Sequence, residues 1–240
     1  MIRDFRHEVQ YKRRAIFSKN TQKFLNCIAD DLAYRKTLKP TGTALYRSQI
    51  GLCEDNDEDG FIYDGFDEDR MKPLRYVAFE GRANPKGIPV MYLSDDSITS
   101  MSELRPQIGQ VISCAKFLTT RELKFVDCCT SEKKYNEAQI CLMVPKSQEE
   151  WRDYLWFQIG QMFSQPIINE GNFAPYVPTQ IISEIFKNEN YDGFYFKSHL
   201  GPGINFVLFE SSDVNMVESD LRVVKKVDYS FEDFDPQKHT

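Results

Sequence analysis

The amino-acid sequence predicts an α+β fold built around one main domain. Short apolar runs of the kind that form strands outnumber the segments with helical spacing, and the two kinds do not alternate strictly. The chain has 240 residues, of which 41% are hydrophobic and 28% are charged, so it can bury a substantial core. A doubly wound parallel sheet is not expected, because that fold needs regular alternation of strands and helices.

The charge composition limits the partners that the surface can bind. Thirty Lys and Arg residues stand against 36 Asp and Glu residues, which gives a net charge of −6. Nucleic-acid backbones and anionic membranes require a basic face, so we expect neither direct nucleic-acid binding nor membrane binding. No apolar run approaches the length of a membrane-spanning helix, and the N-terminus lacks the apolar centre of a secretory signal. A local basic pocket for a small anion remains open.

The six cysteines predict a cytoplasmic protein with reduced thiols. They stand at positions 27, 53, 114, 128, 129 and 141, without CxxC spacing, and three of them lie in strand-like runs. Only three histidines occur, and none is paired with a cysteine at ligand spacing. We therefore expect neither disulfides nor a structural zinc ion, and no metal cofactor.

Residues 1–40 are expected to form a helical N-terminal appendage. Apolar residues recur at helical spacing through Thr21–Leu38, until Pro40 and Gly42 break the pattern. The residues with that spacing are Phe24, Leu25, Ile28 and Leu32. A helix packed on the main domain is the favoured interpretation, and a partner-binding arm is the alternative.

An acidic stretch follows the strand that begins near Leu45. Within Glu54–Arg70, the pattern Asp55-x-Asp57-x-Asp59-Gly60 matches the first half of a calcium-binding loop. The bidentate glutamate that such a loop needs six residues after its glycine is absent, because Phe66 stands there. We therefore predict a solvated, mobile loop and not a metal site.

The middle of the chain reads as three strands and a short helix. Pro89–Leu93 is an apolar run bounded by turn residues, and Val111–Leu118 and Leu123–Cys129 are two further runs. Between them, Asp96 or Ser97 is expected to cap a short helix that carries Glu103 and stops before Pro106.

Two longer helices and two closing strands complete the main domain. Ser147 and Glu150 form a capping box for a helix, and Thr179 is expected to cap another. The core-facing residues predicted for the first helix are Trp151, Tyr154, Leu155, Gln158, Ile159 and Met162. The closing strands are expected at Phe194–Phe196 and Ile204–Phe209, joined through the Gly201–Gly203 loop.

Common catalytic motifs are absent from the sequence. Ser198 and His199 are neighbours on a predicted strand and would point to opposite faces, so a Ser-His-Asp hydrolase is poorly supported. The chain contains no P-loop, no GxGxxG motif and no HExxH motif. What remains is a set of polar residues at strand and helix edges: Arg47, Arg82, Tyr92, Glu103 and Ser198. Each alone is also explained by a salt bridge, core packing, a solvated helix position or a turn.

Taken in order, these residues make the sequence resemble the RES domain family, which is named for its Arg, Glu and Ser. The segments that carry the resemblance are Gly81–Ser94, Ser102–Pro106, Tyr176–Gln180, Tyr191–Ser198 and Asn205–Phe209. It spans about residues 41–227, with the acidic stretch as an insertion and residues 228–240 as a C-terminal tail.

The resemblance implies an ADP-ribosyltransferase-like fold with a split mixed β-sheet and flanking helices. It also implies an enzyme that degrades NAD+ by phosphorolysis or hydrolysis, with inorganic phosphate as a co-substrate in the first case. Many family members are toxins held by a cognate antitoxin, so a toxin or defence effector with such a partner is expected. By matching motifs, Glu103, Arg47 and Ser198 are the predicted catalytic residues, and Arg47, Arg82, Tyr92 and Tyr46 are the predicted NAD+-binding residues.

The chemistry of NAD+ cleavage suits these residue types. Two guanidinium groups can hold a diphosphate through charge-assisted hydrogen bonds of roughly 1.5–3 kcal/mol each. The face of Tyr92 can pack against the cationic nicotinamide ring. Nicotinamide leaves as a neutral molecule without a general acid, so the single carboxylate of Glu103 is sufficient to stabilise the developing sugar cation.

Two other functions remain open at the level of sequence. The same fold could transfer ADP-ribose to a protein target, with the same release of nicotinamide. A non-catalytic interaction module is the alternative from another class, and it predicts that Arg47, Arg82 and Glu103 do not converge.

Overall fold

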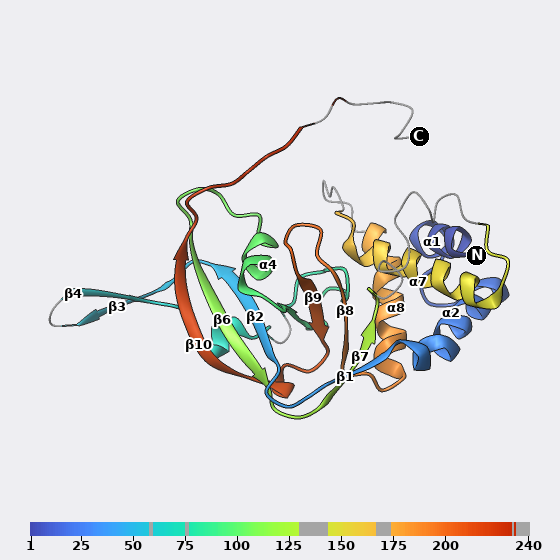
Figure 1. Cartoon of the computed structure of the whole chain (residues 1–240), viewed down its shortest axis with the longest axis horizontal. Coiled ribbons are helices and arrows are strands. Elements are labelled where there is room, and N and C mark those ends of the chain that lie inside the picture. The colour runs from blue at the N-terminus through green and yellow to red at the C-terminus, as the bar shows by residue number, and fades with distance from the viewer. Residues whose placement is uncertain (58–59, 75–76, 130–143, 167–173, 232, 234–240) are drawn as a thin grey trace.

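The computed structural model describes residues 1–57, 60–74, 77–129, 144–166, 174–231 and 233. Within this part of the chain, a mixed sheet has the strand order β1-β7-β8-β9-β5-β2-β6-β10, and helices flank it (Figure 1). The strands of this sheet are β1 (Lys36–Lys39), β2 (Ala44–Ile50), β5 (Met91–Ser94), β6 (Val111–Thr119), β7 (Leu123–Asp127), β8 (Gly193–Lys197), β9 (Ile204–Leu208) and β10 (Val214–Val223). The predicted α+β class is therefore confirmed.

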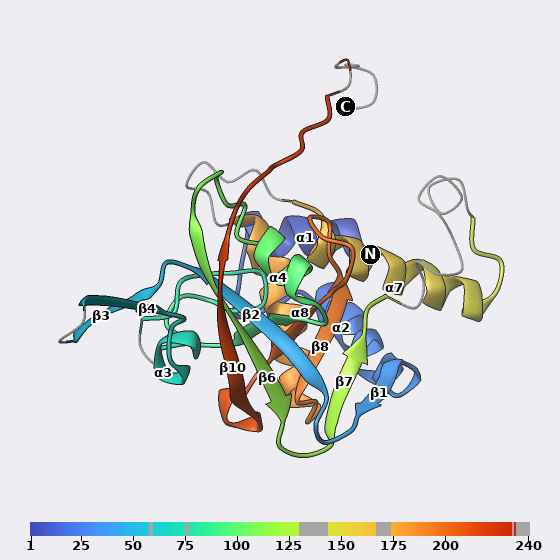
Figure 2. The same cartoon turned by 60° about the vertical axis from the view of Figure 1, so that its left-hand side comes forward.

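The longer helices cover the β7–β8 end of the sheet, whereas the short ones contact β2 (Figures 1 and 2). The helices are α1 (Ile2–Tyr11), α2 (Lys19–Asp31), α3 (Glu68–Met71), α4 (Ser97–Ser102), α7 (Gln148–Ser164) and α8 (Val177–Asn188), with 3-10 turns η1 (Leu32–Arg35), η2 (Ala174–Tyr176) and η3 (Ser211–Asp213). Among the described residues, none of these helices is both long enough and apolar enough to cross a membrane.

The sheet is split between β2 and β5. These two strands pair through a single residue pair, Tyr46 with Ser94, whereas β2 pairs with β6 along its whole length from Ala44 to Ile50. Strand β5 in turn pairs with β9 from Met91 to Ser94. The strands therefore form two half-sheets, β1-β7-β8-β9-β5 and β2-β6-β10, that diverge beyond the single pair. A mixed sheet with flanking helices is thus confirmed, and its weakest junction lies between β2 and β5.

The hydrophobic core lies on both faces of the half-sheet β1-β7-β8-β9-β5. Phe194 and Phe196 pack with α7 and α8, while Tyr195 between them faces the second cluster with Phe125 and Phe206. A strand buried on both faces reads as a continuous apolar run, and all of Gly193–Phe196 are buried. Each large side chain buried in this way contributes about 1.5–3 kcal/mol to stability.

The first forty residues form part of the main core. Phe5 of α1 and Phe24 of α2 are each 1% exposed, and their rings lie 5.0 Å apart within the cluster that contains Phe194. The helix expected through Leu38 ends earlier, because Lys36–Lys39 form β1 and pair with β7. The structure bears out the interpretation that this segment packs on the main domain. Residues on both sides of the expected boundary at residue 40 share one hydrophobic cluster.

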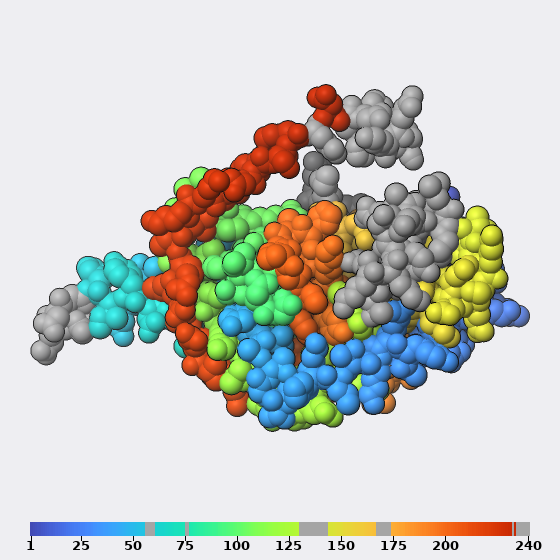
Figure 3. All heavy atoms as spheres, in the orientation of Figure 1, coloured from blue at the N-terminus to red at the C-terminus, as the bar shows by residue number. Residues whose placement is uncertain are grey.

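The acidic stretch is more ordered than predicted. Its first part forms a two-stranded hairpin of β3 (Cys53–Asp57) and β4 (Gly60–Asp64), followed by the short helix α3, so the expectation of a loop is corrected. The hairpin stands away from the body of the molecule (Figures 1 and 3). Asp59 of the half calcium motif lies outside the described residues.

Several helix ends differ from the prediction. Asp96 caps α4 by accepting a hydrogen bond from Thr99 N at 2.8 Å, as expected, but Glu103 is the C-cap residue and does not lie inside the helix. Thr179 lies within α8 and does not cap it; its hydroxyl donates to the Tyr176 carbonyl at 2.8 Å. The helix starts before Thr179 because Pro178 is well tolerated in a first turn.

The buried face of α7 is also corrected. Trp151 was expected in the core, but it is 53% exposed because the first turn of α7 lies at the edge of the helical layer. The residues that fill the core from this helix are Trp156, Phe157, Ile159 and Phe163. Of the predicted core-facing residues of α7, only Ile159 is fully buried.

Candidate active site

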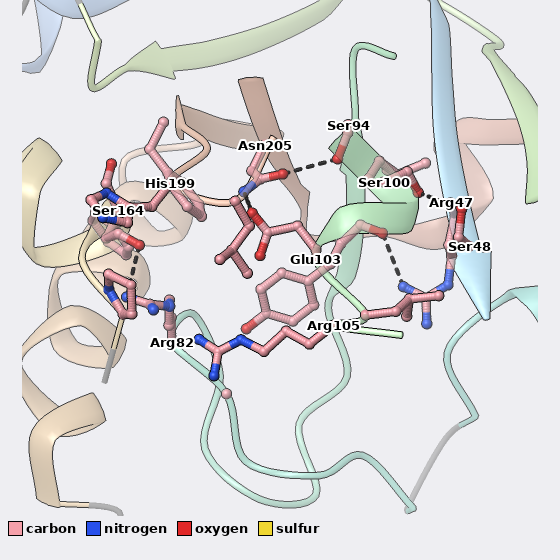
Figure 4. A pocket seen from close by; sticks show the side chains of 18 of the residues that line it. Arg47, Ser48, Arg82, Ser94, Ser100, Glu103, Arg105, Ser164, His199 and Asn205 are labelled. Carbon is pink, nitrogen blue, oxygen red and sulfur yellow. Dashed lines mark hydrogen bonds between the residues drawn. The ribbon is translucent and has the colours of Figure 1, made fainter. Parts of the chain in front are cut away.

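A cavity of about 610 Å³ opens where β2 and β5 diverge (Figure 4). Its lining comes from β2, β5, the loop before β5, the end of α4, the end of α7, η2 and the segments flanking the β8–β9 loop. The polar residues that line it are Arg47, Ser48, Gln49, Arg82, Tyr92, Ser94, Ser100, Glu103, Arg105, Ser164, Tyr176, His199 and Asn205. The site is thus formed by segments that are far apart in the sequence.

Most of the predicted site residues meet at this cavity. Arg47, Arg82, Tyr92 and Glu103 line it, and Ser198 is buried beside it in contact with Glu103. Tyr46 is not among the lining residues, although it was expected to bind NAD+. Its backbone instead forms the single pair with Ser94 that joins the two half-sheets.

One oxygen of Glu103 is fixed by two side chains. Oε1 accepts hydrogen bonds from Ser198 Oγ at 2.7 Å and from Asn205 Nδ2 at 2.6 Å. Asn205 is itself oriented by Ser94, whose hydroxyl donates to Asn205 Oδ1 at 2.9 Å. Among the described residues no hydrogen bond is formed to Oε2, which leaves that oxygen available to a ligand. Hydrogen bonds to a carboxylate are stronger than neutral ones, so the carboxylate has a defined orientation.

The Gly201–Gly203 loop brings Ser198 to Glu103. The Ser198 oxygen accepts hydrogen bonds from the backbone N–H groups of Leu200 (3.1 Å) and Gly201 (2.9 Å), so its proton is directed to Glu103. The loop packs directly on α4, and a Cβ at Gly201 would lie 2.6 Å from Thr99 Cα. Glycine is therefore needed here because the loop backbone touches the helix that precedes Glu103.

Arg47 is a half-buried cation at the place where β2 and β5 diverge. Its Nη1 donates to the Tyr92 carbonyl at 3.0 Å, and its buried Nε has no partner among the described residues. Desolvation lowers the pKa of the Arg47 guanidinium to about 10, so it stays charged at neutral pH. No carboxylate of the described chain forms an ion pair with it. A half-buried cation without a carboxylate partner loses part of its hydration, and a bound anion would offset that loss.

The Arg82 side chain is hydrogen-bonded to the C-terminal end of α7. Its Nη1 donates to the carbonyls of Phe163 at 2.9 Å and Gln165 at 2.5 Å, where the helix dipole favours a positive charge. Burial lowers the pKa of Arg82, while the nearby charge of Glu103 acts in the opposite direction. Part of this guanidinium is therefore used to hold the cavity wall.

Tyr92 holds the loop that carries Arg82. Its hydroxyl donates to Asn84 Oδ1 and accepts from Ala83 N, both at 2.9 Å. Burial raises the pKa of Tyr92 well above its ordinary value, so the hydroxyl is neutral. A Cβ at Gly81 would lie 2.5 Å from this hydroxyl, which explains the glycine there. The ring of Tyr92 remains part of the cavity lining.

Ser94, Arg105, Ser164 and Asn205 are among the cavity residues to which the sequence assigned no role. Ser94 and Asn205 lie in the segments that resemble the RES family, but only the cross-strand register places them next to each other. The buried Oγ of Ser164 has no partner among the described residues. Arg105 has a φ of 49°, which is uncommon for a residue other than glycine.

The described lining has a positive charge surplus. It contains three arginines and one carboxylate, that of Glu103, in a chain whose net charge is −6. The described residues contain no group of three or more His, Cys, Asp or Glu that could hold a metal ion. The site therefore suits an anionic organic ligand with a region that can meet the Glu103 carboxylate.

Comparisons with known proteins place this site in a family context. A family model described as "RES domain" matches residues 62–232, a stretch that includes Arg82, Tyr92, Glu103, Ser198 and Asn205. A chain in the crystal structure of the M. tuberculosis MbcT–MbcA toxin–antitoxin complex is similar, with 14% identity and a TM-score of 0.44, over 82% of this chain and 92% of that one. A likeness of that size carries no argument about function. No curated protein matches the sequence.

Proposed function

Because the chain belongs to the RES domain family, we propose that it is an enzyme that degrades NAD+ by cleaving the bond between nicotinamide and ribose. The observation that supports this proposal best is the Glu103 carboxylate, which is fixed through one oxygen, leaves the other available and stands in an arginine-lined cavity. A cavity of about 610 Å³ is of the size that accepts a cofactor-sized ligand.

The lining supplies opposite charges to the two parts of the substrate. Arg47 and Arg82 provide positive charge for the diphosphate. Neither forms an ion pair with a carboxylate of the described residues, so that charge is available to a ligand. The neutral ring of Tyr92 offers a π-face to the cationic nicotinamide, a contact of about 0.5–2 kcal/mol. Binding would thus orient the ribose toward Glu103.

Bond cleavage needs one carboxylate in this scheme. The electron pair of the C–N bond leaves with nicotinamide, which becomes neutral, and positive charge develops on the ribose ring. The Glu103 carboxylate stabilises that charge, because it is already oriented before the reaction. An oxygen of inorganic phosphate, or water, then bonds to the ribose carbon; water releases its extra proton to the solvent as it does so. Ser198 and Asn205 act as positioning residues for Glu103.

The proposed activity suggests a biological role. A cytoplasmic toxin or defence effector, restrained by an antitoxin protein, would consume NAD+ in this way. Transfer of ADP-ribose to a protein is the second candidate, because the cavity is open and an acceptor side chain could replace water. The interaction-module alternative loses support, because Arg47, Arg82 and Glu103 line one cavity.

Release of nicotinamide tests the proposal directly. Purified protein is incubated with NAD+ at several phosphate concentrations, and nicotinamide and the ADP-ribose product are followed by chromatography. A rate that rises with phosphate, together with a phosphorylated product, indicates phosphorolysis; a rate independent of phosphate indicates hydrolysis. Mass spectrometry of the protein fraction detects a transferred ADP-ribose.

Two variants separate catalysis from folding. Glu103→Gln should retain ADP-ribose binding and lose at least about a hundredfold in turnover, because the stabilising charge is removed. Glu122→Gln, at an exposed glutamate between β6 and β7, is the matched control and should keep its rate. Folded wild-type protein that releases no nicotinamide would refute the proposal, and Glu103→Gln at full rate would remove Glu103 from the mechanism.

A further inference from the structure

The three arginines of the cavity are not equivalent. Arg47 is half-buried and donates a hydrogen bond to the Tyr92 carbonyl, and Arg82 donates to the carbonyls that end α7. Arg105 is exposed and, among the described residues, its side chain forms neither an ion pair nor a hydrogen bond. Of the three guanidinium groups, that of Arg105 is therefore the one with all of its donors available to a ligand.

Arg105 is directed along the cavity and not away from it. Its side chain extends toward Arg82 (Figure 4), and its positive charge contributes to the lowered pKa of Arg82. Two cations held near each other are unfavourable unless an anion lies between them. The two guanidinium groups thus face a common position that suits an anion with more than one charged oxygen.

The backbone of Arg105 adds an independent observation. Its φ of 49° lies in the left-handed region, where glycine and asparagine are the usual residues. The conformation is held by a hydrogen bond from Arg105 N to the Ser102 carbonyl at 3.0 Å, and Pro106 follows. A long charged side chain is a poor choice for this turn on conformational grounds, so its presence calls for a role of the guanidinium itself.

We propose that Arg105 binds the diphosphate of the dinucleotide directly and so makes the site prefer dinucleotides to substrates without a diphosphate. This inference rests on the proposed NAD+-cleaving function and assigns a residue to it. Arg105 makes the bidentate contact, Arg82 adds charge from the α7 side, and Arg47 holds the opposite wall. Arg105 takes no part in breaking the C–N bond.

The test compares substrates with and without the diphosphate. Arg105→Asn suits a positive φ and removes the guanidinium, and Arg14→Asn, at an exposed arginine outside the cavity, is the matched control. The specificity constant kcat/KM for NAD+ should fall about 10- to 100-fold in Arg105→Asn, mostly through KM. The constant for nicotinamide riboside, which has no phosphate, should change by less than about twofold.

Binding of ADP-ribose, measured by calorimetry, keeps the result independent of turnover. Its affinity should fall by the same 10- to 100-fold in Arg105→Asn and stay unchanged in Arg14→Asn. Equal losses for NAD+ and nicotinamide riboside, or no loss of ADP-ribose affinity, would overturn the role of Arg105, as would wild-type protein that does not bind ADP-ribose. Wild-type protein that binds ADP-ribose through Arg105 but releases no nicotinamide would overturn the proposed function and leave this assignment standing.

Discussion

Replacing Tyr92 by phenylalanine removes the two hydrogen bonds that hold the Arg82 loop. The Tyr92 hydroxyl donates to Asn84 Oδ1 and accepts from Ala83 N, and these two residues are 2% and 4% exposed. Both groups would stay buried without their partner, at about 1–3 kcal/mol for each unsatisfied group. Asn84 retains its hydrogen bonds to the carbonyls of Phe79 and Ile88, which limits the collapse of the loop. We therefore expect a loss of about 2–4 kcal/mol in the free energy of unfolding.

Urea unfolding followed by tryptophan fluorescence measures this loss. With a slope of roughly 2 kcal/mol per M, the midpoint should fall by about 1–2 M at an unchanged slope. Tyr63→Phe, at the exposed tyrosine of the β3–β4 hairpin, is the control and should leave the midpoint in place. A midpoint of Tyr92→Phe equal to that of the wild type would refute the reasoning, because it would mean that the hydroxyl does not restrain the loop.

Three further predictions follow from other contacts. Asn205→Asp replaces a hydrogen-bond donor to Glu103 by a second carboxylate, so turnover should fall at least about tenfold because the two charges repel and Glu103 loses its fixed orientation; turnover equal to that of the wild type would contradict the positioning role of Asn205. Hydrogen bonds from Ser18 lower the pKa of Glu8 from 4.5 to about 2. The stability that these bonds give is therefore lost as the pH falls from about 4.5 toward 2. In acid unfolding curves, Glu8→Gln should show a smaller loss of stability over this pH range than the wild type. Arg47→Met removes a half-buried cation that has no carboxylate partner in the described chain. The variant should therefore melt no lower than the wild type by calorimetry, while its affinity for ADP-ribose falls at least about tenfold; a large drop in melting temperature would argue for a structural role.

The strands were the part of the fold that the sequence predicted best. Runs such as Val111–Leu118 and Ile204–Phe209 are bounded by turn residues and buried in the sheet, so local composition and tertiary context agree. The prediction was wrong at Lys36–Lys39, because the helical spacing before them continues while pairing with β7 decides their conformation. The exposed β3–β4 hairpin was missed because its acidic residues resemble a loop.

The candidate site was predicted by motif and not by geometry. Glu103 and Ser198 are 95 positions apart and meet at 2.7 Å; the family resemblance named both as functional residues but did not predict this contact. The roles of Asn205 and Arg105 needed the structure, because one depends on the register of β5 with β9 and the other on a backbone angle. Tyr46, in contrast, was expected at the site because it precedes Arg47 in the sequence, but it does not line the cavity.

The position of β2 ahead of the segment matched by the family model has a practical consequence for expressing shorter versions of the protein. The family match begins at residue 62, inside the hairpin, so a protein trimmed to that match would lose β2 together with Arg47. It would also lose α1, α2 and β1, and with them the buried Phe5, Phe24 and Ile28. The remaining chain would expose one edge of β6 and the apolar surface of α8, which favours aggregation. We therefore expect the smallest unit that folds to be longer than the segment matched by the family model, and truncation for crystallisation should spare the N-terminus.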